Sequence, residues 1–415
     1  MKKFFALITT FAIGVAALSS CSSNKQEDTR AKYVFLFIGD GMGNSHVAVT
    51  ESYLSAKAGK IGGEQLTMTQ FPYYGTCTTH CLDKTITCSA ASGTAIASGQ
   101  KTLYSRLGCD ENFNRLESMA FDLKEDGYKI GILSSVPITH ATPAAFYAST
   151  PDRGDGYGIM KQIPDSGFDF FGGSGFEDMF GKDGQQIGAD QYLEQNGYEV
   201  CFGQEEFLAE ADNCEKIIFC QESGRADDAK TYVSEATDAN DITLGEMLQL
   251  GIDFLGDAEP FFIMCEGGDI DWESHSSYTM PMIEKVINFD NAIAVAYEFY
   301  KAHPDETLIV VTADHETGGV SLGEGESWSN TFIDWIKIEE EWEKQKEVCL
   351  QDAKANAEFN AAAHIGWTTS YHTGAPVPVF AIGKGAEKFS GRIDNTDIKG
   401  KILGEEAEKN YLCKL

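Results

Sequence analysis

The chain has 415 residues, of which 42% are hydrophobic, and its formal net charge is -32 at pH 7. This length and composition indicate a globular protein with a substantial core and exclude a disordered chain. The acidic balance argues against nucleic acid as a binding partner, because that function needs a basic surface.

The start of the chain has the features of an export signal. Lysines at the second and third positions precede an apolar run, 4–18, that is too short to span a membrane comfortably. The Leu-Ser-Ser-Cys that ends at Cys21 resembles a bacterial lipoprotein cleavage site. We expect a signal peptide at 1–20, a lipidated tether at 21–30, and an exported protein anchored in the periplasm or at the cell surface. An ordinary signal peptide that happens to contain a cysteine is the alternative.

Five short runs rich in Val, Ile and Phe end abruptly in polar residues and predict buried strands. They are residues 34–38, 130–133, 261–264, 308–311 and 377–382. Segments of helical length lie between them. This alternation predicts an α/β fold, a three-layer sandwich with a large, mostly parallel central sheet and helices on both faces.

Two stretches interrupt the alternation. Residues 322–363 are rich in Glu, Lys and Trp, with a helical segment near 338–357, and we interpret them as an insertion over the active face. Residues 180–240 form a second, acidic and glycine-rich excursion. The remainder, 31–415, is expected to be a single domain.

Polar residues follow the first four predicted strands. Asp40 comes after the first, in Gly-Asp-Gly-Met-Gly, whose glycines allow a tight turn and a close approach of a ligand. The loop 134–140 follows the second strand, Glu266 the third, and Asp314 with His315 the fourth. Because ligands of parallel sheets gather at the carboxyl ends of the strands, these side chains are candidates for one site.

Three further features carry groups suited to metal or phosphate. Asp271 and His275 are four residues apart, so on a helix both face the same way, a sound spacing for two ligands of one metal. Ser89 lies in a run of small residues that suits an anion held against backbone N–H groups at a helix start. His372 stands alone in His-Thr-Gly. Each histidine by itself is more often an ordinary core or surface residue, but several in order at strand ends favour a site.

The eleven cysteines leave their pairing open. An exported chain can form disulfides, and spacing would allow Cys77 with Cys81, or pairs among Cys201, Cys214 and Cys220. A zinc knuckle built on Cys77 and Cys81 is a weaker interpretation, because no second ligand pair follows at a matching spacing.

Six motifs are specific in combination and in this order: Gly-Asp-Gly-Met-Gly, Ser-Ala-Ala-Ser-Gly-Thr-Ala, Ala-Thr-Pro-Ala-Ala, Glu-Gly-Gly-Asp-Ile-Asp-x-x-x-His, Thr-Ala-Asp-His and His-Thr-Gly. With them the sequence resembles the alkaline phosphatase family over about residues 32–383, and especially its marine, cold-adapted bacterial branch. The resemblance implies the alkaline phosphatase fold and hydrolysis of phosphate monoesters through a phosphoserine intermediate, with two zinc ions and one magnesium ion. It also implies a homodimer, which is common in the family.

The resemblance gives each polar residue a role. The ligands of the first zinc ion would be Asp271, His275 and His372, and those of the second Asp40, Asp314 and His315. The ligands of magnesium would be Asp40, Thr142 and Glu266, together with waters. The nucleophile would be Ser89, and the group that grips two phosphate oxygens in a bidentate fork would be Arg153.

Three residues depart from the family pattern. Enteric-type enzymes carry Asp and Lys where this chain has His140 and Trp272, and the imidazole at 140 can itself ligate metal; we expect weaker binding of phosphate and a stronger dependence on added magnesium. Cys88 replaces an Asp that holds the arginine. Three interpretations stay open: Arg153 is less constrained, a thiolate replaces the carboxylate, or Cys88 is the nucleophile in place of Ser89.

Other activities of the same superfamily fit less well. A sulfatase needs Cys or Ser in a Cys/Ser-x-Pro-x-Arg context, and Cys88 is followed by Ser-Ala-Ala-Ser. A phosphodiesterase stays open, as does an inactive, surface-anchored metal-binding protein, although Ser89 and Arg153 beside a full set of ligands argue against the latter.

Overall fold

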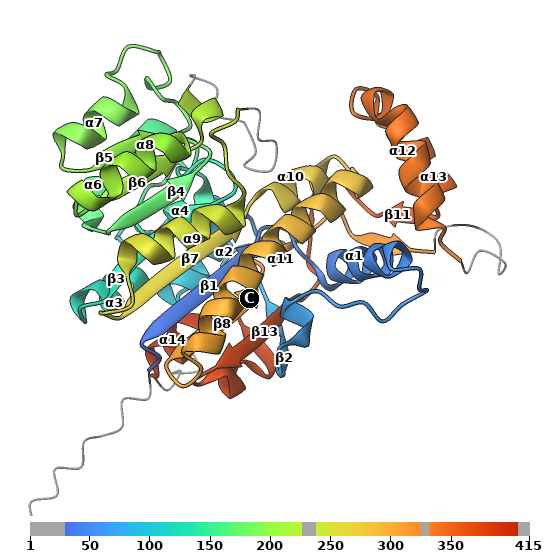
Figure 1. Cartoon of the computed structure of the whole chain (residues 1–415), viewed down its shortest axis with the longest axis horizontal. Helices are drawn as coiled ribbons and strands as arrows, with labels where there is room; N and C mark the ends of the chain where they lie inside the picture. Colours follow the sequence, from blue (N-terminus) through green and yellow to red (C-terminus); the bar gives the residue numbers. More distant parts are fainter. Residues whose placement is uncertain (1–29, 226–237, 324, 326–331, 406–415) are drawn as a thin grey trace, which may run out of the picture.

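The computed structural model describes residues 30–225, 238–323, 325 and 332–405. Its centre is a ten-stranded sheet in the order β14-β2-β13-β8-β1-β7-β3-β4-β6-β5 (Figure 1). The strands are β1 (Tyr33–Gly39), β2 (Tyr73–Thr78), β3 (Lys129–Ser134), β4 (Phe170–Gly173), β5 (Glu199–Phe202), β6 (Ile217–Cys220), β7 (Phe261–Gly267), β8 (Thr307–Thr312), β13 (Val377–Gly383) and β14 (Gly391–Asp394). Strand β13 runs antiparallel to β2 and β8, and every other pairing in this sheet is parallel.

The middle of the sheet consists of the strands that the apolar runs predict. All side chains of β1, β7 and β8 are buried, as expected for parallel strands covered on both faces. Ile38 in β1 is level with Glu266 in β7 and with Thr312 in β8. Because these strands run parallel, the polar residues that follow them meet at one edge of the sheet.

Helices cover both faces of the sheet, so the predicted three-layer α/β fold is confirmed. On one face lie α1 (Asn44–Lys57), α9 (Leu244–Leu255) and α11 (Thr279–Ala302). On the other lie α2 (Ser89–Ser98), α3 (Met119–Glu125), α4 (Ala141–Ala144) and α14 (Asp397–Leu403). The remaining helices of the main body are α5 (Gly156–Met160), α6 (Ile163–Ser166), α7 (Ala189–Gln195), α8 (Gly203–Glu210) and α10 (Asp269–His275).

The acidic excursion at 180–240 is part of the sheet, which corrects the sequence interpretation. It contributes β5 and β6, which form one edge of the sheet beside β4 (Figure 1). Both strands are only four residues long, so their apolar signal was too short to stand out among acidic and glycine residues.

The stretch 322–363 forms two helices where the sequence predicted one. They are α12 (Trp335–Cys349) and α13 (Ala353–Ala362), and Asp352 caps the second by accepting a hydrogen bond from the Lys354 N–H. Helix α12 packs on α1, and α13 packs on β11 (Ile365–Trp367), which pairs with β10 (Val320–Leu322). That the stretch is an insertion in a single domain stays a prediction.

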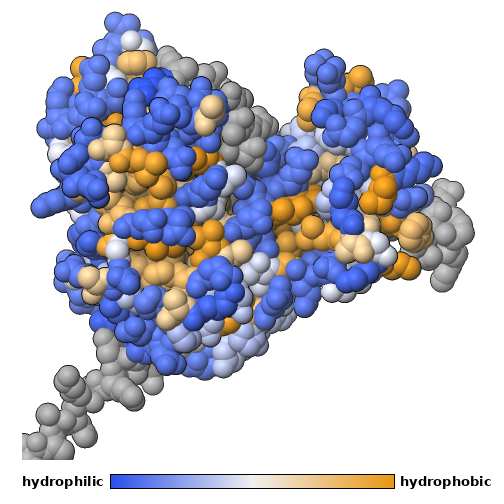
Figure 2. All heavy atoms as spheres, in the orientation of Figure 1, coloured by the Kyte–Doolittle hydropathy of each residue, from blue (hydrophilic) through white to orange (hydrophobic). Residues whose placement is uncertain are grey.

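The cysteines of the described residues are free thiols, so the pairings that spacing allowed do not occur in this structure. No helix in the same residues is both long and apolar enough to cross a membrane. The face seen in Figure 2 is largely hydrophilic, with hydrophobic patches between the polar areas. Cys21 lies outside the described residues.

Candidate active site and metal centre

The glycines around Asp40 let three segments approach each other closely. Gly41 has φ of 73°, and a Cβ added there would lie 2.9 Å from the Asp271 Cα. A Cβ at Gly43 would lie 2.2 Å from the Glu316 Cγ. The turn after β1 therefore needs glycine to deliver Asp40 against the segments that carry Asp271 and Glu316.

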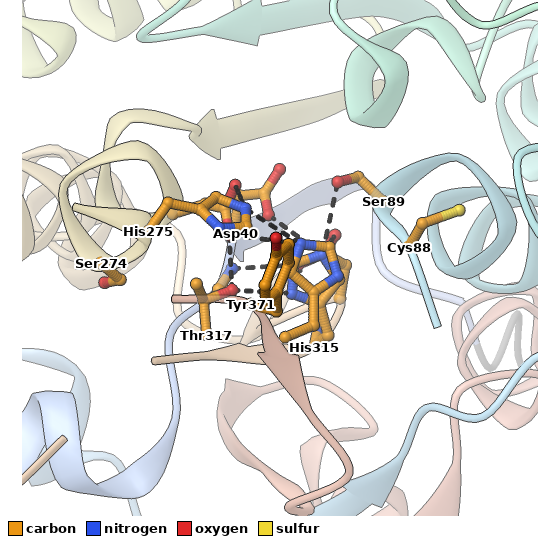
Figure 3. A network of polar contacts seen from close by, with 12 residues as sticks. Asp40, Cys88, Ser89, Ser274, His275, His315, Thr317 and Tyr371 are labelled. Carbon is orange, nitrogen blue, oxygen red and sulfur yellow. Dashed lines mark hydrogen bonds and ion pairs between the residues drawn. The ribbon is translucent and has the colours of Figure 1, made fainter. Parts of the chain in front are cut away.

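Ser89 is the first residue of α2, and its hydroxyl points toward the imidazole of His315, with 3.3 Å between Ser89 Oγ and His315 Nε2 (Figure 3). All ten residues of α2 are buried, and Gly93 lets the helix pack tightly on α4. A Cβ at Gly93 would lie 3.2 Å from the Ala145 Cβ and 3.4 Å from the Thr142 Cα. The small residues of this run thus hold α2, which Ser89 begins, closely against α4.

The first cluster of potential metal ligands contains Asp271, His275 and His372. As the four-residue spacing predicted, Asp271 and His275 share one face of α10, with 3.2 Å between Asp271 Oδ2 and His275 Nε2. His372 belongs to β12 (His372–Thr373), which pairs with β9 (Glu316–Thr317). Its Nε2 lies 3.7 Å from Asp271 Oδ1.

The hydrogen bonds of these histidines leave their Nε2 atoms free to bind a cation. His275 Nδ1 lies 2.7 Å from the Ser370 carbonyl oxygen, and His372 Nδ1 lies 2.9 Å from that of Thr87. A carbonyl oxygen only accepts, so each Nδ1 carries a proton, and in a neutral imidazole the Nε2 then holds a lone pair. The two Nε2 atoms are 3.2 Å apart, a contact that is favourable only when a proton or a metal ion lies between them.

His315 follows the same pattern. Its Nδ1 lies 3.3 Å from the Thr317 hydroxyl oxygen, and the Thr317 hydroxyl donates its own hydrogen to Asp271. The Nδ1 of His315 therefore donates, and in the neutral ring its Nε2 holds a lone pair. That Nε2 faces Asp314 Oδ2 at 3.1 Å and Asp40 Oδ1 at 3.5 Å.

Two more clusters share Asp40. One contains Asp40, Asp271 and His315, with Asp314 next to it, and the other contains Asp40, His140 and Glu266. Asp40 Oδ1 and Asp314 Oδ2 are buried and have no hydrogen-bond donor among the residues that the structure describes. A buried carboxylate oxygen without a donor is costly, and a metal ion would satisfy it.

The electrostatics of the clusters also fit cations. Burial raises the pKa of Asp40 well above its ordinary value, and the neighbouring Asp314 and Asp271 raise it further. Burial opposes ionisation of Asp271 as well, but the hydrogen bond with His275 and nearby imidazoles hold its pKa below the ordinary value. Burial lowers the pKa of His372 to about 4, so this imidazole is neutral at pH 7, the form that ligates metal.

The third cluster contains His140, one of the residues that depart from the family pattern, and Trp272 packs against it. His140 Nδ1 lies 3.1 Å from Glu266 Oε1, and the Thr142 hydroxyl donates to Asp40 Oδ2 at 3.2 Å. The indole of Trp272 meets the His140 ring edge-on, with 5.9 Å between centroids. Arg153 Nη2 lies 3.5 Å from His140 Nε2. The structure thus brings together all the residues that the sequence selected.

Sequence reasoning missed the buried residues behind the ligands. His46 is fully buried; its Nδ1 accepts from the Gly43 N–H at 3.1 Å, and its Nε2 therefore donates to Ser274 Oγ at 3.0 Å. The Glu316 carboxylate accepts from the Thr373 hydroxyl and from the Gly319 N–H. These bonds join α1, α10, β9 and β12. The acid after Asp-His was visible in the sequence, but nothing there marks His46.

Cys88 directly precedes Ser89 in the chain, and its side chain points elsewhere. In Figure 3 its sulfur is directed away from the cluster that Ser89 faces. The thiol is 3% exposed, and its Sγ accepts a hydrogen bond from the Ser105 N–H at 3.1 Å. This orientation argues against Cys88 as the nucleophile.

A pocket of about 530 Å³ opens over the clusters. The residues that line it are Ile86, Thr87, Cys88, Ser89, Tyr104, Ser105, His140, Arg153, Asp271, Trp272, His275, Tyr371 and His372.

Comparison with known proteins decides the family. The family model described as alkaline phosphatase matches residues 31–170 and 181–405. The chain belongs to the alkaline phosphatase family. Alkaline phosphatases are phosphate monoester hydrolases, and the resemblance that the motifs carried is confirmed.

Relatives and solved structures match most of the chain. Alkaline phosphatase 4 of Bacillus subtilis (strain 168) is 29% identical over 91% of this chain and 89% of its own length. The alkaline phosphatase of the Antarctic bacterium TAB5 is 29% identical, covers 90% of this chain and 98% of its own, and has a TM-score of 0.72. The cold-active enzyme of Shewanella sp. is 27% identical, with coverages of 90% and 99% and a TM-score of 0.74. A variant of the TAB5 enzyme, with Glu in place of a histidine, has magnesium bound in its M3 site.

Proposed function

We propose that this chain hydrolyses phosphate monoesters through a phosphoserine intermediate on Ser89. The observation that carries the proposal is the set of three imidazoles whose Nδ1–H groups are held by oxygen acceptors. Their free Nε2 atoms face buried carboxylates beside the Ser89 hydroxyl. Such a donor set suits zinc, and the pocket above it exposes Arg153 to substrate.

The proposed metals are two zinc ions and one magnesium ion. The zinc ligands would be Asp271, His275 and His372 for the first, and Asp40, Asp314 and His315 for the second. The magnesium ligands would be Asp40, Thr142 and Glu266, and His140 is a possible further ligand. When bound, the ions would stabilise charge on the attacking and leaving oxygens of an in-line displacement. The magnesium in the M3 site of the TAB5 variant supports a third site of this kind.

In the proposed reaction, Ser89 attacks phosphorus and Arg153 binds the phosphoryl group. Ser89 opens α2, where the N–H groups of the first turn and the helix dipole favour its alkoxide and the oxygens of the phosphoryl group. Its Oγ forms a bond to phosphorus as the bond to the alcohol oxygen breaks, and the alcohol leaves with a proton. Arg153 holds two phosphoryl oxygens through both steps. Water then cleaves the Oγ–P bond, which returns the serine and releases phosphate.

The proposed activity can be tested with three esters of the same alcohol. We expect kcat/KM for the phosphate monoester to exceed that for the methyl phosphate diester and the sulfate ester by about a thousandfold or more. The reason is charge, since a site built from cations and Arg153 favours the dianion over either monoanion. A diester or sulfate ester hydrolysed faster than the monoester would replace the proposal with one of the alternative activities.

Cys88 gives a second test. We expect Cys88→Asp to lower KM and the inhibition constant of phosphate by about fivefold. A carboxylate at this position can form a charge-assisted hydrogen bond with Arg153 and hold its side chain ready to bind phosphate. Cys88→Ala should stay within about twofold of the parent, since a neutral thiol is a weak acceptor. If Cys88→Ala weakens phosphate binding strongly and Cys88→Asp restores it, a thiolate at position 88 holds Arg153 in the parent protein.

We also propose that the protein is exported and anchored in the membrane by lipid on Cys21. The Leu-Ser-Ser-Cys motif and the polar segment after it support this. Cys21→Ser is expected to move most of the protein from the membrane fraction to the soluble exported fraction, measured by detergent partitioning. A variant that still partitions like the parent would contradict the anchor. A homodimer stays a prediction.

A further inference from the structure

The mouth of the active-site pocket carries exposed aromatic and apolar side chains. Tyr371 is 72% exposed, Ile86 44% and Tyr104 39%, and all three line the pocket together with Trp272. Phosphate and its metals need only the polar floor of this pocket. Its volume of about 530 Å³ lies in the range of about 300–1,000 Å³ that is usual for pockets that enclose a whole small molecule.

Tyr371 lines the pocket next in the chain to a residue of the first metal-ligand cluster. Ser89, His275 and His372 line this pocket together with Tyr371, and Tyr371 directly precedes His372 in the chain. Figure 3 draws Tyr371 in the same view as His275 and His315.

The backbone of Tyr371 is fixed while its ring stays available. Its carbonyl accepts from the Gly318 N–H at 3.0 Å, and its N–H donates to Thr369 Oγ1 at 3.2 Å. Within the described part of the chain no aromatic ring or cation stacks on the Tyr371 ring. Tyr104, by contrast, already has the Lys84 ammonium 4.5 Å from its ring centre. A rigidly mounted, uncovered aromatic face in a pocket is a stacking surface for another flat group.

We propose that Tyr371 sets substrate preference by stacking on a flat aromatic group in the alcohol part of the ester. The favoured substrates are then phosphate monoesters of nucleosides or of aromatic alcohols. The formal charge of -32 opposes polyanions such as nucleic acid ends, so the aromatic group belongs to a small ester. This inference rests on the proposed function, since it concerns the same site.

Two substrate pairs test the preference without changing the reacting bond much. Adenosine 5′-monophosphate is compared with ribose 5-phosphate, and benzyl phosphate with ethyl phosphate; each pair differs mainly in the aromatic group. We expect kcat/KM to favour the aromatic member by about tenfold in at least one pair, in line with the strength of base–aromatic stacking. Tyr371→Ala should bring that ratio close to one, and Tyr371→Phe should keep it. Phe332→Ala, an exposed aromatic residue outside the pocket, is the matched control and should also keep it.

The possible outcomes distinguish the role of Tyr371 from the proposed phosphatase activity. A preference in the first pair alone identifies nucleosides, and one in the second identifies aromatic alcohols, provided that Tyr371→Ala removes it. Equal kcat/KM within both pairs, or a preference that survives Tyr371→Ala, overturns the role of Tyr371 and leaves the phosphatase proposal intact. Failure to hydrolyse any of the four esters overturns the proposed function itself.

Discussion

Replacing Ser89 with alanine is expected to lower kcat for a phosphate monoester by about a thousandfold or more. The variant loses the group that takes the phosphoryl, so only direct attack by water at the remaining site can continue. Steady-state rates measure the loss, and acid-quenched samples incubated with labelled substrate should show no phosphoprotein. Ser98→Ala is a matched control, because it makes the same change in the same helix, at a hydroxyl whose bonds are to the backbone of Thr94 and Gln100. It should stay within about twofold of the parent.

The Ser89 result also tests the assignment of the nucleophile. If Ser89→Ala turns over substrate at the parental rate, the covalent mechanism is wrong. If Ser89→Ala keeps activity while Cys88→Ala loses it, the nucleophile is Cys88, against the direction of its sulfur in the structure.

Removal of metal by a strong chelator is expected to abolish hydrolysis, with a loss of about a thousandfold or more, and zinc with magnesium should restore it. Without cations, the carboxylates of Asp40, Asp271 and Asp314 repel each other in a buried site, so the Tm should fall as well. A chelator already saturated with zinc is the control. Unchanged activity and Tm after chelation would refute the metal centre.

Magnesium should be the first ion lost on dilution of the metal supply. Its proposed ligands include only two carboxylates, those of Asp40 and Glu266, and His140 offers a neutral imidazole where magnesium prefers oxygen. Activity of stripped protein given zinc alone should therefore be partial and rise on addition of magnesium. Full recovery with zinc alone would show that the third cluster needs no metal.

The candidate site could be predicted to a large extent because its residues lie where strong local signals end. The apolar runs of β1, β7 and β8 are followed by Asp40, Glu266 and Asp314, and sheet geometry brings such residues together. The spacing of Asp271 and His275 is a property of one helix. The hydrogen bond between His46 and Ser274 joins residues that are 228 positions apart. No local sequence pattern indicates such a contact, so it becomes visible only in the folded structure.

The outer parts of the sheet were less predictable for a related reason. Strand β4 reads Phe-Phe-Gly-Gly and β14 reads Gly-Arg-Ile-Asp, so neither has the apolar run or the alternation typical of a strand. Pairing with a neighbour already in place decides their conformation. The break between α12 and α13 is similar, because it depends on the cap at Asp352 and on packing against α1 and β11.

The direction of β13 has a consequence for how such sites can change during evolution. Because β13 runs opposite to β8, the chain leaves the sheet at Asp314 and re-enters it near His372 on the same edge. The pairing of β9 with β12 closes the base of this excursion. The part of the excursion that holds α12 and α13 lies away from this base, so it can lengthen, shorten or be exchanged while the ligands on either side keep their places. The number of residues between the Asp-His and His-Thr-Gly motifs is therefore free to drift, and searches for related enzymes should match these motifs without a fixed gap.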